Sequence, residues 1–320
     1  MASLILVTGG AGFIGSHIVD RLLLEGYSVR VLDNFSSGRL ENIRHHRGGV
    51  EVLNADLKDF EASVKAVSGV EAVFHFAANP EVRVSTINPE IHFNENIVAT
   101  FNLLEAMRKA GVKQLIFASS SSVYGEPNGI PVDESAPLRP VSVYGASKAA
   151  CESLIHAYSR LYGIRAAALR YANVVGPRLR HGVVYDFIIK LMKQPGLLEV
   201  LGDGTQVRSY IHVSDAVEAT ITVWRNLKEG FEAYNVGSED WVDVNEIAGI
   251  VTSAMGLRDV KYAYKPVLHG VGWLGDVKRI ALAIDRLKGL GFQPKMNSRQ
   301  ALTEAAKSII QELRGELNPL

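Results

Sequence analysis

Short apolar runs alternate with longer amphipathic stretches along the first half of the chain. The apolar runs cover residues 4–7, 28–32, 50–53, 72–76, 114–118 and 166–169, and the stretches at 57–67, 93–110 and 149–162 have helical spacing. Alternation of this kind is typical of strands joined by crossover helices. It therefore predicts an α/β fold with a parallel sheet.

The pattern weakens after Pro177. Helical spacing returns at residues 215–224, 246–255 and 301–313, with shorter apolar runs between them. Internal repeats, low-complexity tracts and long charge runs are absent from the sequence. The second half therefore predicts a smaller α/β domain.

A glycine-rich segment follows the first apolar run. Gly9, Gly12 and Gly15 stand three residues apart, with Phe13 and Ile14 between the last two. A strand, a glycine turn and a helix in this order favour dinucleotide binding, because glycines let the backbone approach a pyrophosphate at the positive end of the helix. A tight turn that binds no ligand is the alternative interpretation.

An acidic residue ends the second apolar run. Asp33 stands eighteen residues after Gly15. A carboxylate at this place accepts hydrogen bonds from ribose hydroxyls and repels a 2′-phosphate. We therefore predict a Rossmann-type doubly wound sheet that binds NAD rather than NADP.

Ligands of open α/β sheets lie at the carboxyl ends of the strands. The residues expected there are Asp56 and Leu57 near the adenine, and Phe76, Ala77 and Ala78 near the pyrophosphate. His75 precedes this last group and has no second metal ligand at suitable spacing. We therefore interpret His75 as structural and predict no metal site.

Tyr144 and Lys148 stand four residues apart on a predicted helix. Their side chains then leave one helix face, with roots roughly 6 Å apart. A cation beside a phenol favours the phenolate and lowers the pKa of the tyrosine. The pair would exchange a proton with a substrate hydroxyl, and a solvated helix face is the alternative.

Four serines, at positions 119–122, end the fifth apolar run. They fit either a linker or a strand end that presents a hydroxyl to a substrate. Prolines at 127, 131, 137 and 140 then predict a long ordered loop before the helix that carries Tyr144.

Composition narrows the classes of partner. The 320 residues are 47% hydrophobic and 21% charged, and 34 basic residues balance 34 acidic ones, so no charged surface for nucleic acid or membrane is expected. Cys151, the single cysteine, excludes an internal disulfide and a multi-cysteine metal site, and we expect a buried thiol. The amino terminus lacks the features of a signal peptide, so a cytoplasmic location is expected.

Several motifs together resemble the extended short-chain dehydrogenase/reductases. They are the glycine turn, Asp33, Asp56, the His-x-Ala-Ala box at 75–78, the serines before Val-Tyr-Gly at 123–125, Tyr144-x-x-x-Lys148 and Arg-Tyr-x-Asn at 170–173. Residues 202–213 and 234–237 are similar to the nucleotide-sugar branch, most of all to UDP-glucose 4-epimerases. The resemblance covers nearly the whole chain. It implies an NAD-binding domain at 1–176, with segments at about 213–240 returning to it, and a substrate-binding domain at 177–320.

The resemblance also implies the site residues. The implied catalytic residues are Ser120, Tyr144 and Lys148. The implied cofactor contacts are Gly9, Gly12, Phe13, Ile14, Gly15, Asp33, Asn34, Asp56, Leu57, Phe76, Ala77, Ala78, Asn96, Ser119, Tyr144, Lys148 and Tyr171. The implied substrate contacts are Ser120, Ser121, Tyr144, Asn173, Arg208 and Asp276. Asn173 and Arg208 would hold the diphosphate or uridine end, and a structural arginine in a turn is the alternative for Arg208.

The implied reaction is isomerisation of a UDP-sugar at carbon 4. UDP-galactose and UDP-glucose would interconvert through a transient 4-keto sugar, with NAD regenerated. Dehydratases of this family carry Asp-Glu directly after the catalytic hydroxyl and decarboxylases usually keep the Glu, whereas this chain has Ser121 and Ser122. A dehydratase, decarboxylase or reductase, and a non-catalytic NAD-binding regulator, remain the alternatives.

The resemblance further implies a homodimer. Two helices from each subunit commonly pair in this family, and residues 93–110 and 144–162 carry apolar side chains on more than one face. Examples are Ala149, Leu154, Ile155 and Leu161. Coverage of the second face by loops of the same chain is the alternative.

Four positions depart from the family pattern. Ala99 replaces a glycine, Pro80 replaces a lysine for which Arg83 could substitute, and Trp273 replaces an arginine that clamps the diphosphate. Weaker nucleotide-sugar binding is expected unless Arg208 or Lys278 supplies the charge. Ile280 stands where some epimerases have a tyrosine that closes the pocket, so we expect N-acetylated sugars to be accepted.

Overall fold

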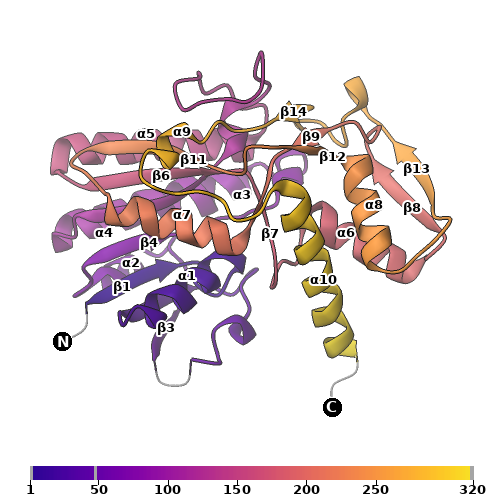
Figure 1. The fold of residues 1–320 in the computed structure, drawn as a ribbon. Coiled ribbons are helices and arrows are strands. Elements are labelled where there is room, and N and C mark those ends of the chain that lie inside the picture. The colour runs from indigo at the N-terminus through magenta and orange to yellow at the C-terminus, as the bar shows by residue number, and fades with distance from the viewer. Residues whose placement is uncertain (1–2, 47–48, 318–320) are drawn as a thin grey trace. The chain divides into compact units, whose positions relative to one another are not determined.

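The computed structural model describes residues 3–46 and 49–317. The chain forms two compact units. One contains the chain up to Tyr124 with Pro137–Arg170 and Val217–Tyr234, and the other contains Gly125–Ala136, Tyr171–Ala216 and the chain from Asn235 onward. Figure 1 traces the elements of both units.

The described residues form helices and strands that alternate through most of the chain. The strands are β1 (Leu4–Thr8), β2 (Ser28–Asp33), β3 (Val50–Asn54), β4 (Ala72–His75), β5 (Gln114–Ser120), β6 (Arg165–Tyr171), β7 (Asn173–Val175), β8 (Leu197–Leu201), β9 (Val207–Arg208), β10 (Tyr210–His212), β11 (Phe231–Val236), β12 (Val242–Asp243), β13 (Lys261–Lys265) and β14 (Arg279–Ile280). The α-helices are α1 (Phe13–Leu24), α2 (Phe60–Val67), α3 (Glu90–His92), α4 (Ala99–Ala110), α5 (Val143–Tyr162), α6 (Gly182–Lys193), α7 (Val213–Arg225), α8 (Val244–Ala254), α9 (Asp285–Lys288) and α10 (Ser298–Leu317). Short 3-10 turns lie at Leu40–Asn42, Val82–Thr86, Ser121–Tyr124 and Leu268–Gly270, and Phe93–Val98 is π-helical.

A seven-stranded sheet organises the first unit. Its strand order is β11-β6-β5-β4-β1-β2-β3, and the pairs from β5 through β3 are parallel. The chain moves outward from β1 in one direction and then returns to β4 on the other side. This reversal creates the crevice in which doubly wound folds bind ligands, so the predicted fold class is confirmed.

Strand register brings the predicted cofactor residues to one edge of this sheet. Thr8 of β1 lies beside both Leu32 of β2 and His75 of β4, and Asp33 lies beside Asn54 of β3. The segments that follow these residues therefore begin at nearly the same level. The sequence pattern predicted this arrangement because parallel strands all end on one side.

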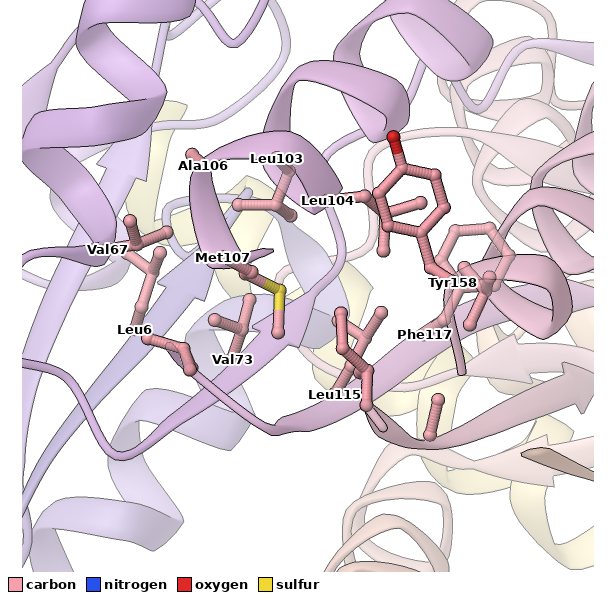
Figure 2. Close-up of a cluster of buried hydrophobic side chains, with 14 of the residues drawn as sticks. Leu6, Val67, Val73, Leu103, Leu104, Ala106, Met107, Leu115, Phe117 and Tyr158 are labelled. Atoms are coloured by element: carbon pink, nitrogen blue, oxygen red, sulfur yellow. The ribbon is translucent and has the colours of Figure 1, made fainter. Parts of the chain in front are cut away.

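Helices α2, α4 and α5 bury apolar side chains against one face of the sheet (Figure 2). Leu6 of β1, Val73 of β4 and Phe117 of β5 point into this cluster. Met107 of α4 and Ile155 of α5 pack against them. The opposite face contacts α7, where the Trp224 ring lies 5.0 Å from that of Phe74. Because both faces are covered, the strands need continuous apolar runs rather than alternating ones.

Several helix boundaries differ from the sequence prediction. Helix α2 begins at Phe60, not at residue 57, because the Asp59 carboxylate accepts the N–H of Glu61 (3.0 Å) and caps the helix. Helix α5 begins at Val143, six residues before the apolar pattern at 149–162 and one residue before Tyr144, because the Ser142 hydroxyl accepts the N–H of Gly145 (3.1 Å). Polar caps fix these ends where the apolar pattern gave no boundary.

The second unit contains small sheets and several helices. The sheets are β10-β7, β12-β9-β14 and β13-β8. Helices α8 and α10 lie at two of the helical stretches predicted in the second half, but the pairing of these short strands was not predicted. Within residues 3–46 and 49–317, no helix combines the length and apolar character that crossing a bilayer requires.

Candidate functional site

The glycine turn between β1 and α1 is packed too closely for side chains. Gly9 has a left-handed backbone (φ +68°), and a Cβ there would lie 2.6 Å from the amide nitrogen of Ala77. A Cβ on Gly15 would lie 2.2 Å from the carbonyl oxygen of Gly9. Helix α1 begins at Phe13, and Gly12 before it offers no side-chain cap. The positive end of α1 therefore suits a phosphate.

Asp33 ends β2 beside this turn. Its Oδ2 accepts the N–H of Ala11 (2.9 Å) and its Oδ1 accepts the N–H of Phe35 (2.9 Å). Burial raises the pKa of the Asp33 carboxyl, and the two backbone hydrogen bonds oppose that rise. A Cβ on Gly38 would lie 2.7 Å from Asp33 Oδ1, so only glycine leaves space on that side of the carboxylate.

The residues predicted for the adenine and pyrophosphate also lie at strand ends. Asp56 Oδ2 accepts a hydrogen bond from the Asn34 side chain (2.9 Å), and Leu57 is buried. The N–H of Ala77 donates to the hydroxyl of Thr8 (3.3 Å). The structure therefore gathers the residues predicted from Gly9 to Ala78 around the ends of β1 to β4.

His75 has a structural role, as predicted. It is buried, with Nδ1 2.7 Å from the Thr8 hydroxyl and Nε2 3.0 Å from the Thr100 hydroxyl. Burial, followed by the charge of Lys148, lowers the pKa of His75 to about 3. A neutral imidazole between two hydroxyls ties β1, β4 and α4 together.

Asn96, a predicted cofactor contact, uses its side chain within the protein. It lies in the π-helical segment before α4, and its Nδ2 donates to the Ser147 hydroxyl (2.8 Å) of α5. Its Oδ1 accepts the N–H of Asn79 (3.0 Å) beyond β4. Asn96 thus positions α5 relative to the segment that follows β4. Helical π-bulges frequently mark functional sites.

Tyr144, Lys148 and Ser120 meet where α5 passes the end of β5. A hydrogen bond joins the Tyr144 and Ser120 side chains. The Lys148 ammonium donates to the carbonyl oxygen of Ala118 (2.7 Å) and lies 5.9 Å from the centre of the Tyr144 ring. The structure therefore brings the three predicted catalytic residues together.

The electrostatic expectation for Tyr144 was wrong for this state of the protein. Burial raises the pKa of Tyr144 to about 12, and the Ser120 hydrogen bond opposes the rise only in part. Burial also lowers the pKa of Lys148 to about 8. Desolvation is the largest cause of both shifts, and the ammonium is hydrogen-bonded to a carbonyl rather than to the phenol.

A buried ionic network beneath the site was not predicted. Arg170 Nη2 contacts Glu152 Oε2 (2.7 Å), and the two side chains are 7% and 4% exposed. Glu152 also accepts the hydroxyl of Ser119 (2.5 Å), and Arg170 donates to the hydroxyl of Tyr124 (2.9 Å). Burial would lower the pKa of Arg170, but Glu152 outweighs it and raises that pKa. The sequence offered two separate signals, Glu152 one turn after Lys148 and Arg170 in the Arg-Tyr-x-Asn motif, but nothing that joined them.

His92 is a second residue that sequence reasoning missed. It is fully buried on α3, with its ring centre 5.6 Å from that of Tyr144 at a 68° angle. Neither ring nitrogen has a hydrogen-bond partner among residues 3–46 and 49–317. Burial lowers the pKa of His92, so a neutral imidazole packs against Tyr144.

The predicted substrate contacts Asn173, Arg208 and Asp276 belong to the second unit, as does Tyr171. Arg208 Nη2 donates to Asp276 Oδ1 (2.8 Å) and to the carbonyl oxygen of Val277. Asn173 lies on β7 with an exposed side chain, and Tyr171 is buried at the end of β6. Of these four residues, the structure pairs Arg208 with Asp276.

The departure at Trp273 has a structural consequence. The indole Nε1 is buried, and it has no hydrogen-bond partner within the described part of the chain. Lys278 contacts both carboxylate oxygens of Asp203 (2.7 Å each). Both cations considered as replacements for the family arginine are thus engaged with carboxylates, Lys278 with Asp203 and Arg208 with Asp276.

Known proteins resemble this chain over almost its whole length. A UDP-glucose 4-epimerase of Mycolicibacterium smegmatis is 34% identical over 324 residues, which cover 97% of this chain and 98% of the relative. A crystal structure of a UDP-galactose 4-epimerase is 49% identical with a TM-score of 0.88, covering 97% and 99% of the two chains. The Thermus thermophilus UDP-glucose 4-epimerase in complex with NAD is 36% identical with a TM-score of 0.85, covering 96% and 99%.

The description of the matching family agrees with the chemistry of the site. Residues 5–237 match the NAD dependent epimerase/dehydratase family. This range includes the glycine turn, Asp33, Ser120, Tyr144 and Lys148. The chain therefore belongs to the NAD dependent epimerase/dehydratase family, and the family resemblance and the NAD cofactor expected from the sequence are confirmed.

Proposed function

We propose that the protein is an isomerase that interconverts UDP-galactose and UDP-glucose with NAD as its cofactor. The observation that carries this proposal is the hydrogen-bonded pair Ser120 and Tyr144, with Lys148 on the next turn of α5. The unit that contains the seven-stranded sheet binds NAD. The other unit binds the nucleotide sugar.

The glycine turn and the uncapped start of α1 fit a dinucleotide phosphate, and the Asp33 carboxylate fits a ribose. Bound NAD supplies a reversible acceptor for one hydride. Tyr144 takes the proton of the sugar 4-hydroxyl while carbon 4 loses its hydride, and Ser120 hydrogen-bonds to the same oxygen. Lys148 orients the nicotinamide ribose.

Inversion at carbon 4 requires the 4-keto sugar to rotate, so that its opposite face is presented to the cofactor. Rotation about its link to the diphosphate presents the opposite face, so the hydride returns from the other side and Tyr144 gives back the proton. Arg208 and Asn173 hold the diphosphate or uridine end during this rotation. A planar guanidinium suits that task because it donates two parallel hydrogen bonds to phosphate oxygens.

Elimination chemistry is the principal alternative, and the residues after Ser120 argue against it. Ser121 and Ser122 begin a 3-10 turn where dehydratases have an acid pair. The Ser122 hydroxyl donates to Ser120 Oγ (2.9 Å), so it supports the catalytic hydroxyl. Neither serine is a general acid at neutral pH.

Incubation with UDP-galactose and NAD tests the proposal. We expect UDP-glucose to form, with no net production of NADH, because the hydride is returned in each cycle. Chromatography of the nucleotide sugars with absorbance at 340 nm measures both quantities. A 4-keto-6-deoxy product would indicate a dehydratase, and binding of NAD without any sugar conversion would indicate a regulator.

NAD rather than NADP should support turnover. A 2′-phosphate about 4 Å from the Asp33 carboxylate would be repelled by about 4 kcal/mol at an effective dielectric constant of 20, which is roughly three orders of magnitude in kcat/KM. Asp33→Asn keeps a side-chain oxygen that accepts a backbone N–H and removes the negative charge. The ratio of kcat/KM for NAD to that for NADP should therefore fall. Equal turnover of the wild-type enzyme with both cofactors would contradict this role for Asp33.

The enzyme should also epimerise UDP-N-acetylglucosamine. Ile280 lies on β14 beside Arg208 of β9 and is buried, and a tyrosine there would add volume. We expect Ile280→Tyr to remove turnover of the acetylated sugar and to retain that of UDP-glucose. The volume-conserving Ile280→Leu is the control, and thermal melting checks the fold of each variant. Wild-type turnover of the unacetylated sugar alone would contradict an open pocket.

A homodimer packed through α4 and α5 is the proposed assembly. Phe101 on α4 is 45% exposed and Leu161 on α5 is 70% exposed, whereas Ile155 is buried within its own unit. These exposed apolar side chains suit a helix-to-helix interface. Light scattering across a dilution series measures the mass against the 34.9 kDa chain.

The cytoplasmic location remains a prediction from the sequence.

A further inference from the structure

A cluster of histidines converges on one carboxylate outside the catalytic site. Asp20 lies on the outer part of α1, and His45 and His46 lie in the turn that follows the 3-10 segment Leu40–Asn42. Asp20 Oδ1 lies 2.6 Å from His46 Nε2 and 3.2 Å from His45 Nε2. His17, one turn earlier on α1, places Nδ1 4.0 Å from Asp20 Oδ2.

The geometry of this cluster matches the needs of a metal ion. Asp20, His45 and His46 each offer a ligand atom, and these atoms lie within 4.8 Å of one another. A tetrahedral zinc ion with bonds of about 2.0–2.1 Å separates its ligand atoms by roughly 3.3 Å. Small rotations of the side chains would therefore bring all three onto one ion.

The three side chains are only partly exposed. A metal ion can therefore reach them from solvent, and partial burial limits their conformational freedom. The side chains of Asp20 and His46 are 23% and 20% exposed, and that of His45 is 46% exposed. The His45 and His46 ring centres are 3.9 Å apart, so the two imidazoles lie side by side next to the same carboxylate.

We propose that Asp20, His45 and His46 form a binding site for a divalent transition metal ion of the zinc type. Imidazole nitrogens with one carboxylate favour such an ion over calcium or magnesium, which prefer oxygen ligands. Water occupies the fourth position. The site is separate from the residues proposed for the reaction, so its existence does not depend on the activity.

The site would connect two segments that border the glycine turn. The N–H of Arg39 and the Asn42 side chain both donate to the carbonyl oxygen of Ala11 (2.9 and 2.8 Å), which already anchors the segment after β2 to this turn. A metal held between α1 and His45–His46 would add a second anchor to the same segment. Metal binding should therefore stabilise the first unit against unfolding.

Titration of tag-free, chelator-treated protein tests the proposal. Cobalt(II) serves as the spectroscopic probe, because tetrahedral coordination gives strong visible absorption, and zinc should displace it at one equivalent per chain. Loss of an outer-sphere partner alone costs about 10–100-fold in metal affinity, so the double variant His45→Gln/His46→Gln should lose more than roughly 100-fold. Asp20→Asn, which keeps the side-chain shape, should also weaken binding.

His269→Gln, which removes an exposed histidine in the second unit, is the matched control and should bind metal as the wild type does. Circular dichroism establishes that each variant is folded. A zinc-dependent rise in melting temperature should occur in the wild type and the control and be lost in the double variant. Failure of the wild type to bind cobalt or zinc, or equal binding by the folded double variant, would overturn the proposal.

Discussion

Tyr144→Phe lowers the turnover number of UDP-galactose by about 10²–10⁴-fold, the range for loss of a positioned general acid–base. The variant keeps the ring that packs against His92 but loses the hydroxyl that bonds to Ser120. NAD binding should remain, because the glycine turn, Asp33 and Lys148 are unchanged in this variant. Steady-state kinetics and titration with NAD, followed by fluorescence, measure the two effects.

The same variant tests the proton chemistry through its pH dependence. Burial raises the pKa of Tyr144 to about 12 and lowers the pKa of Lys148 to about 8. Raising the pH increases the phenolate fraction of the wild type, whereas above about 8 Lys148 loses its proton. Phenylalanine cannot ionise, so a higher pH should not restore activity to Tyr144→Phe.

Tyr162→Phe on the same helix is the control, because its side chain is 38% exposed and it lies outside the proposed site. Turnover of this control should be close to that of the wild type. A loss of NAD binding equal to the loss of turnover in Tyr144→Phe would mean that Tyr144 is mainly structural.

Glu152→Ala is expected to destabilise the protein by about 3–5 kcal/mol, the usual effect of removing one partner from a buried ion pair. The substitution leaves the Arg170 guanidinium buried without its carboxylate and also removes the acceptor for the Ser119 hydroxyl. Urea unfolding followed by circular dichroism measures the change in the free energy of unfolding.

Glu229→Ala provides the comparison for this measurement. Glu229 lies 3.9 Å from Arg165, but its side chain is 86% exposed, and exposed pairs contribute only about 0–1 kcal/mol. The two variants thus compare loss of a buried ion pair with loss of a surface ion pair in the same unit, each by a glutamate-to-alanine substitution. If the two variants unfold at equal urea concentrations, the buried network does not stabilise the unit.

Local patterns explain why the sequence predicted much of the NAD-binding side. The order of strand, glycine turn and helix between Leu4 and Leu24 depends on neighbouring residues, and so does the position of Asp33 after the second strand. The spacing of Tyr144 and Lys148 likewise follows from helix periodicity alone. Parallel strands share one carboxyl end, so these local features predict a common site without knowledge of distant contacts.

Tertiary structure decided the features that depend on burial and on residues far apart in the sequence. The pKa of Tyr144 rises rather than falls because the surrounding protein desolvates the phenol. Asp20 meets His45 and His46, and Glu152 meets Arg170, only after helices and strands have packed. Sequence spacing determines which side chains share an element, whereas packing between elements determines which of them meet and how far each is removed from water.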